Sequence, residues 1–297
     1  MRLSDGREVF CKLHEGLTEQ ARKRTLVLMH GGPGESCISF GLCLDSLRTL
    51  ADVIETDQRG CGRSEEEPDE AKISVNQVLE DFEEIRRHYR LRDWIVWGHS
   101  FGGRLALDYA RNYPESTKAV ILENPAVDIQ DGLHCILRGY ESYFRSRGRE
   151  EEAVRMGALK EEKDIVKCLD AVNAVADHDK QRFWSNHLLS EEAARLLDMS
   201  RLPIEQRLRC VSFFHQMKRD ESFSRNGWEL LKSLGCPILL LCGEKDRILD
   251  GQLLEAFQSS QKCGQIRHVS GCGHYIHLGN VDEMTAYVRN FLSAFCG

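Results

Sequence analysis

The chain of 297 residues has little of what marks linkers, membrane spans and nucleic-acid surfaces. Its six prolines are too few for a proline-rich linker, and no stretch approaches the roughly 20 apolar residues that a bilayer span needs. Lys and Arg number 40 against 47 Asp and Glu, which gives a net charge of −7 and a pI near 5.9. Because phosphate binding needs clustered Lys and Arg, we expect neither a nucleic-acid nor a membrane partner.

Cysteine is plentiful, but its spacing is not that of a metal site. The 12 cysteines are scattered without a Cys-x-x-Cys pair, and a zinc site would need tighter clustering of Cys and His. The opening residues, MRLSDGREVFCKLHEG, lack the apolar run of a signal peptide. We therefore expect reduced, mostly buried thiols, a cytoplasmic protein, and neither a metal nor a cofactor.

The features that are present indicate a large folded α/β unit. The chain is 41% hydrophobic and 29% charged, which suits a sizeable core under a hydrated surface. Apolar runs that alternate with helical patterns predict a mostly parallel sheet with helices on both faces. The six runs are Leu26–Met29, Val53–Thr56, Trp94–Trp97, Val120–Leu122, Pro237–Leu241 and Ile266–Val269.

The alternation of strands and helices breaks between residues 128 and 234. That stretch has no strand-like run and is dense in Arg, Glu and Lys. Its apolar residues follow helical spacing, as in Leu133, Ile136, Leu137, Tyr140 and Phe144. We predict a helical cap over residues 128–234, inserted into a core formed by residues 1–127 and 235–297. Open α/β sheets bind ligands at the carboxyl ends of their strands, so the cap should lie over that edge.

The pentapeptide Gly98-His99-Ser100-Phe101-Gly102 carries the strongest chemical signal. It follows a predicted strand and precedes a helical run, so its G-x-S-x-G pattern stands in the strand–turn–helix context that a nucleophilic serine requires. The glycines permit a sharp turn, and the helix N-terminus stabilises a developing oxyanion. We predict that Ser100 is a nucleophile, with an ordinary glycine-rich turn as the alternative.

A nucleophilic serine needs a base, and the base needs a carboxylate that fixes its tautomer. Asp246 ends the turn after the strand-like run 237–241, and His274 lies in the glycine-flanked loop at 271–274. The chain order Ser100, Asp246, His274 is the order found in α/β-hydrolases. Rivals for the acid are Asp250 and Glu244, and rivals for the base are His268 and His277, whose positions favour structural roles.

The run His30–Gly34, HGGPG, follows the first predicted inner strand. A glycine there can bring a backbone N–H to a substrate carbonyl oxygen, and we predict an oxyanion hole from the N–H groups of Gly32 and Phe101. A phosphate-binding loop is the alternative, but the run lacks the Gly-Lys-Ser/Thr of a P-loop. In the next glycine-containing loop, DQRGCGRS, Asp57 and Arg59 are expected to brace the loop rather than to catalyse.

Taken together, the motifs resemble those of the proline iminopeptidase-like α/β-hydrolases, the S33 type of peptidase. They are HGGPG at 30–34, DQRGCGRS at 57–64, the serine motif, GEKD at 243–246 and GCGH at 271–274. The resemblance covers about residues 20–125 and 236–295. It implies an α/β-hydrolase fold and hydrolysis of an N-terminal residue, often proline, from short peptides. Acidic cap residues hold the free amino group in such enzymes, and Glu221 is the candidate in this chain.

Two departures from the family pattern leave the substrate open. Prolyl-specific members usually carry a Gly-Gly-Ser-Trp-Gly elbow, whereas this chain has Gly-His-Ser-Phe-Gly-Gly-Arg, and its cap shows no familiar acidic motif. The elbow is also similar to those of menaquinone-pathway lyases and C–C hydrolases. We predict a serine aminopeptidase acting on short peptides or aminoacyl amides. An esterase, lactonase or lyase acting on a small molecule is the alternative, and a receptor that kept the fold is a third.

Overall fold

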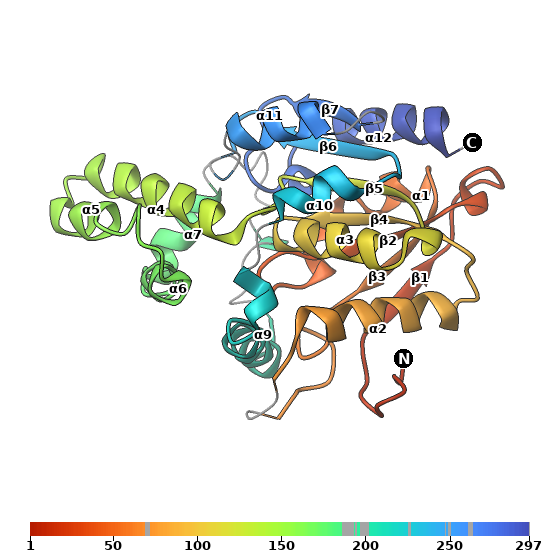
Figure 1. Cartoon of the computed structure of the whole chain (residues 1–297), viewed down its shortest axis with the longest axis horizontal. Coiled ribbons are helices and arrows are strands. Elements are labelled where there is room, and N and C mark those ends of the chain that lie inside the picture. The colour runs from red at the N-terminus through yellow and green to blue at the C-terminus, as the bar shows by residue number, and fades with distance from the viewer. Residues whose placement is uncertain are drawn as a thin grey trace.

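The computed structural model describes residues 1–68, 72–185, 193, 195–196, 202–224, 227–246, 248, 251–260 and 264–296. Its centre is a seven-stranded sheet in the order β1-β3-β2-β4-β5-β6-β7 (Figure 1). The strands are β1 (Cys11–His14), β2 (Thr25–Met29), β3 (Asp52–Thr56), β4 (Trp94–His99), β5 (Thr117–Glu123), β6 (Ile238–Gly243) and β7 (Gly264–Val269). Only the edge strand β1 runs antiparallel to its neighbour, so the predicted α/β fold with a mostly parallel sheet is confirmed.

The inner strands are buried on both faces, which explains their continuous apolar sequences. Every residue of β2, β4 and β6 is buried. Successive side chains of β4 point to opposite faces, so Val96 joins one hydrophobic core while Ile95 and Trp97 join the other. Burying one such large side chain stabilises the fold by about 1.5–3 kcal/mol.

Helices cover both faces of the sheet. On one side lie α2 (Val75–His88) and α3 (Phe101–Asn112), and on the other lie α1 (Leu44–Arg48) and α12 (Val281–Phe295). Helix α12 buries one stripe, with Met284, Val288, Phe291 and Leu292 at helical spacing, whereas α3 is buried over most of its length. Helix α11 (Gly251–Ser260) joins β6 to β7.

In the part of the chain that the structure describes, the segment between β5 and β6 contains helices joined by turns and loops, and no strand. Its helices are α4 (Ile129–Arg145), α5 (Glu150–Gly157), α6 (Ile165–Asn173), α7 (Asp177–Ser185), α9 (Ile204–Met217) and α10 (Trp228–Ser233), with a 3₁₀ turn at Glu221–Ser224. Figure 1 shows α4, α5, α6 and α7 beyond one end of the sheet. Helix α10, by contrast, packs against α3 and α11 beside the sheet. The division into a core and a cap at residues 128 and 234 stays a prediction.

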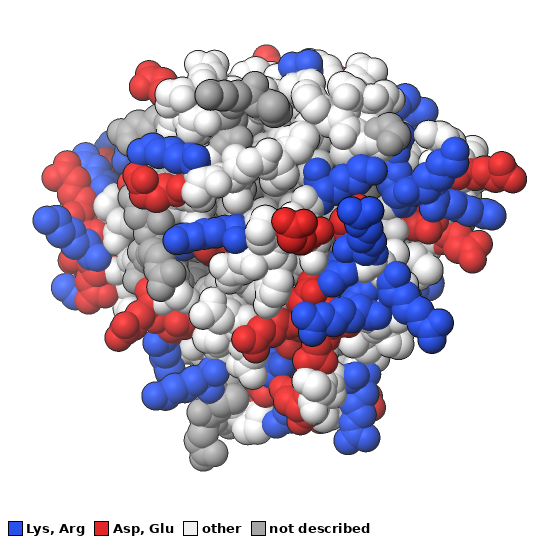
Figure 2. All heavy atoms as spheres, turned by 45° about the vertical axis from the view of Figure 1, so that its right-hand side comes forward, with Lys and Arg blue, Asp and Glu red and all other residues white. Residues whose placement is uncertain are grey.

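Two further sequence expectations can be compared with the described residues. Eleven cysteines fall within them and all are free, while Cys263 lies outside the described part. No helix of the described chain is both long enough and apolar enough to cross a membrane. On the face shown in Figure 2, Lys and Arg side chains lie beside Asp and Glu side chains.

Candidate active site

Ser100 occupies a sharp turn between β4 and α3, as the G-x-S-x-G pattern predicts. Its backbone has φ 52° and ψ −119°, a conformation that is strained for a residue with a side chain and that is held because its surroundings fix it. A Cβ at Gly98 would lie 2.1 Å from the Gly102 carbonyl oxygen, and one at Gly102 would lie 2.1 Å from that of Met29. The two glycines are therefore needed for α3 to pack so closely on the sheet.

His274 and Asp246 form a buried pair at the carboxyl edge of the sheet. The Nδ1 atom of His274 lies 3.1 Å from Oδ1 of Asp246, and the Asp246 side chain has no exposed surface. Burial by itself disfavours the protonated ring, but the Asp246 carboxylate outweighs it and raises the pKa of His274 above its ordinary value. The pairing has the form needed to fix the tautomer of a general base.

The serine turn lies next to the His274–Asp246 pair. The ring of His99, the preceding residue, lies 4.8 Å from the ring of His274. Within the part of the chain that the structure describes, the Ser100 hydroxyl and the His274 ring share no hydrogen bond. Catalytic hydrogen bonds are often long without substrate and tighten when it binds. The catalytic roles of Ser100, His274 and Asp246 stay predictions.

The HGGPG loop lies against the serine turn. A Cβ at Gly31 would be 3.2 Å from Cβ of Ser100, so the two segments touch. Phe101 is the first residue of α3, and a first-turn N–H has no partner within its own helix. Neither Phe101 nor Gly32 donates a backbone hydrogen bond to any described residue. Both N–H groups are thus available for an oxyanion, in the role that we predict for them.

The loop DQRGCGRS braces the site, as expected. The fully buried Asp57 accepts hydrogen bonds from the Ser36 hydroxyl at 2.8 Å, from the Cys37 N–H at 2.9 Å and from Nε of Arg63 at 2.7 Å. Arg59 forms two hydrogen bonds of 2.6 Å with Asp81. Asp57 and Arg59 thus hold loops together and face no reacting group.

Comparison with known proteins agrees with this architecture. The family described as alpha/beta hydrolase fold matches residues 24–281. The chain belongs to the α/β hydrolase fold family. The proline iminopeptidase of Thermoplasma volcanium is 26% identical over 300 aligned positions, which cover 96% of this chain and 92% of that one. The proline iminopeptidase of Heyndrickxia coagulans is 35% identical over 102 residues, 34% of this chain and 35% of its own length. The match to the Heyndrickxia protein thus spans only about a third of that protein's length, whereas the weaker match to the Thermoplasma protein spans most of both chains.

Solved structures share the fold of this α/β hydrolase. Proline iminopeptidase of Mycobacterium smegmatis superimposes with a TM-score of 0.71 at 16% identity, over 97% of this chain and 95% of the other. MenH from S. aureus gives 0.66 at 19% identity, over 97% and 99%. Identities this low show the fold alone. The resemblance predicted from the motifs is confirmed.

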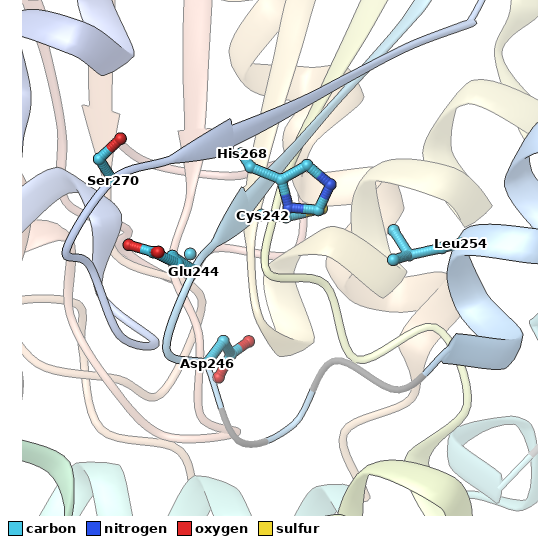
Figure 3. Close-up of a pocket in the computed structure, with 7 residues that line it drawn as sticks. Cys242, Glu244, Asp246, Leu254, His268 and Ser270 are labelled. Atoms are coloured by element: carbon cyan, nitrogen blue, oxygen red, sulfur yellow. The ribbon is translucent and has the colours of Figure 1, made fainter.

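The rival acids and bases of this α/β hydrolase occupy other positions. Glu244 is exposed and accepts the Gly271 N–H at 2.8 Å, so it ties one loop to another. His268 is exposed on the edge strand β7. Asp250 lies outside the described residues. Figure 3 shows Asp246 at the turn after β6, next to a cavity of about 330 Å³ that Cys242, Leu254 and His268 help to line.

Sequence reasoning missed a second buried carboxylate–imidazole pair. One oxygen of Glu123, at the end of β5, accepts the backbone N–H of His277 at 3.0 Å and lies 2.7 Å from its Nδ1. The other accepts Nε1–H of Trp97 at 3.0 Å. Burial disfavours the charged form, but the interactions with His277, including its backbone N–H, outweigh it and lower the pKa of Glu123 to about 2. The sequence offered one signal for this pair, because Glu123 is a carboxylate directly after the predicted run Val120–Leu122.

Asn124, the residue after Glu123, bonds to the loop that carries His274 and to the end of β6. Its side-chain amide donates to the carbonyl oxygens of Gly273 at 3.0 Å and His274 at 2.8 Å, and its oxygen accepts the Gly243 N–H at 2.8 Å. Its φ of 41° is one that Asn tolerates better than most residues. The end of β5 therefore holds both loops that carry Asp246 and His274.

His99, Glu123 and His277 also come close enough to hold a metal ion, with ligand atoms within 4.8 Å of one another. Both Glu123 oxygens and Nδ1 of His277 are, however, already hydrogen-bonded. Burial disfavours the protonated form of His99 and holds the pKa of this ring well below its ordinary value. We interpret Glu123 and His277 as a hydrogen-bonded support beneath the serine turn, with the His99 ring packed against it.

Aromatic side chains from the helical insertion approach the site. The ring of Trp184, in α7, lies 5.3 Å from the ring of His274, and that of Phe223 lies 5.6 Å from Phe101. Helix α9 packs on the HGGPG loop, because a Cβ at Gly34 would lie 2.2 Å from the Cys210 carbonyl oxygen. Glu221 is exposed and begins the 3₁₀ turn that also contains Phe223. Its role as an amine anchor stays a prediction.

Proposed function

We propose that the chain is a serine hydrolase that releases an N-terminal residue, proline or another small apolar residue, from short peptides or aminoacyl amides. The observation that carries this proposal is the strained serine turn beside a buried His274–Asp246 pair at one edge of the sheet. The similarity to proline iminopeptidases supports the choice of substrate.

In this mechanism Ser100 Oγ attacks the scissile carbonyl carbon while Nε2 of His274 takes its proton. Asp246 holds the other ring nitrogen as N–H and stabilises the imidazolium. The N–H groups of Gly32 and Phe101 bind the oxyanion, and each such donor is worth about 3–4 kcal/mol in the transition state. His274 then protonates the leaving amine. Water, deprotonated by His274, hydrolyses the acyl-enzyme and restores Ser100.

The surroundings of the pair support an apolar side chain in the substrate. Trp184 and Phe223 extend from the helical insertion towards His274 and Phe101, so they would line the space above the scissile bond. Aromatic faces bury apolar rings and chains well, including the ring of proline. We keep the expectations of a small-molecule or short-peptide substrate, no nucleic-acid or membrane partner, no metal or cofactor, and a cytoplasmic location.

A second candidate is an esterase, lactonase or lyase that uses the same three residues on a small molecule. The elbow Gly-His-Ser-Phe-Gly favours it, because this sequence departs from the prolyl-specific pattern. A panel of chromogenic aminoacyl amides, acyl esters and lactones separates the two. We expect the highest kcat/KM with a prolyl or alanyl amide. A clear preference for esters or lactones would replace the aminopeptidase with the second candidate.

A further inference from the structure

Glu35 places a carboxylate beside Ser100 that the mechanism above does not use. It directly follows the HGGPG loop. Its Oε2 atom lies 2.8 Å from the position that a Cβ at Gly31 would take, and Cβ of Ser100 lies 3.2 Å from the same position. The carboxylate and the nucleophile therefore border the same small volume, on the loop that would bind the oxyanion.

Among the described residues, the hydrogen-bond partner of the Glu35 carboxylate is a neutral group. The Tyr275 hydroxyl donates to Oε1 at 2.8 Å. Among the residues that the structure describes, no Lys or Arg nitrogen lies within 4.0 Å of Glu35, and Oε2 accepts no hydrogen bond. Nearby buried carboxylates differ, because Asp57 pairs with Arg63 and Asp81 with Arg59. Glu35 is half-buried, and its Oε2 atom borders the volume next to Ser100.

A carboxylate that has no ion pair with a described Lys or Arg affects the reaction at Ser100. Negative charge develops on the substrate oxygen during attack, and a neighbouring carboxylate opposes it. A cation on the substrate would neutralise Glu35 and would form a charge-assisted hydrogen bond with it. In an aminoacyl substrate the ammonium nitrogen is bonded to the carbon next to the attacked carbonyl, so it arrives within a few bond lengths of Ser100.

We propose that Glu35 binds the α-ammonium group of the substrate and selects free aminoacyl groups over N-blocked ones. This inference rests on the proposed serine hydrolase function and deepens it. It assigns the specificity to the oxyanion loop of the sheet domain, whereas the family resemblance places the anchor in the cap, with Glu221 as its candidate. Glu221 is exposed, while Glu35 borders the nucleophile.

The test is the ratio of kcat/KM for a free aminoacyl p-nitroanilide to kcat/KM for its N-acetylated form. E35Q keeps the size of the side chain and an oxygen that can accept from Tyr275, but it removes the charge. We expect the wild-type ratio to lie well above one and to fall about 10- to 100-fold in E35Q. E35D keeps a carboxylate and should retain a ratio above one. Because the ratio compares two substrates on one protein, a general loss of activity cancels.

Two controls make the result specific. Y275F removes the hydrogen-bond partner and leaves the charge, so the ratio should persist, and E221Q should leave it unchanged. A high ratio that survives in E35Q, or one that collapses in E221Q instead, overturns the inference. A wild-type ratio near one, with p-nitrophenyl acetate still hydrolysed through Ser100, overturns the inference and spares the serine chemistry. Absence of both amide and ester hydrolysis overturns the proposed function itself.

Discussion

At the scale of single residues, the site contains two carboxylate–imidazole pairs of similar chemistry and different surroundings. His277 and Glu123 are fully buried, and Phe40 stacks on the His277 ring at 4.0 Å. His274 faces the serine turn and has Asp246 behind it. The His277 ring has no exposed surface, so its pair supports the fold, whereas the His274–Asp246 pair, next to the serine turn, is the one that we propose for catalysis.

The first residue-scale prediction concerns the acid. D246N should lower kcat by about 10³- to 10⁴-fold, because an amide can hold the His274 ring in the wrong tautomer. E244Q is the matched control, since Glu244 lies two residues away and accepts the Gly271 N–H. Steady-state kinetics on a prolyl amide measure both. A loss in E244Q as large as that in D246N would contradict the assignment of the acid.

The second residue-scale prediction concerns pH. Asp246 raises the pKa of His274 above its ordinary value, and the base acts when it is deprotonated. The kcat/KM of the wild type should therefore fall as pH drops through a value above about 6.5. Removing the carboxylate in D246N should move this acidic limb to lower pH, measured on the residual activity. An unchanged limb, or one at higher pH, would show that another group titrates.

At the scale of elements, Glu123 at the end of strand β5 and Asn124 directly after it hold the loops that carry Asp246 and His274. Glu123 accepts from the segment after His274, and Asn124 bonds to that loop and to the end of β6. Parallel strands end at a common edge, so one strand end can organise the loops of its neighbours. The geometry of the His274–Asp246 pair therefore depends on a strand that supplies neither residue.

E123Q tests this dependence. Both carboxylate oxygens accept hydrogen bonds from buried donors, and an amide must turn its NH₂ group towards one of them. We expect the free energy of unfolding to fall by about 1–3 kcal/mol in urea denaturation. E66Q, at an exposed glutamate, should change it by less than about 0.5 kcal/mol. Equal urea midpoints for E123Q and the wild type would refute the role of Glu123.

Local patterns account for what could be predicted from the sequence. The apolar runs predict β2 to β7, and the spacing of Gly98, Ser100 and Gly102 predicts the serine turn. The glycine-flanked loop favours His274 over His277 as the base, but the sequence does not show which distant carboxylate faces each ring. Glu123 and His277 are 154 positions apart, and Glu35 and Tyr275 are 240 apart. These contacts exist only once the sheet has brought its loops to one edge.

At the scale of the whole molecule, the helical insertion meets the sheet domain at the HGGPG loop. Gly34 has a φ of 93°, and its Cα faces the Cys210 carbonyl of α9 without room for a side chain. Trp184 and Phe223 reach the site from the same insertion. Because α9 packs on this loop, the position of the helical insertion over the site depends on the position of the oxyanion loop.

G34A tests this contact. A methyl group would displace α9, so the buried Cys210 thiol should react faster with iodoacetamide, and KM should rise. G148A is the matched control, because Gly148 has a φ of 70° and nothing within 4 Å of the added atom. Mass-spectrometric mapping measures alkylation at Cys210. Equal alkylation rates in G34A and G148A would mean that α9 is not held by this contact.

The most direct measurement of the central claim is covalent labelling with a fluorophosphonate probe, followed by peptide mapping. An activated serine in this setting should take up one probe per chain, at Ser100, and S100A should remain folded and unlabelled. Turnover of any accepted substrate should fall in S100A by at least about 10³-fold. Labelling of a different residue, or S100A that hydrolyses substrate at near wild-type rate, would contradict the account.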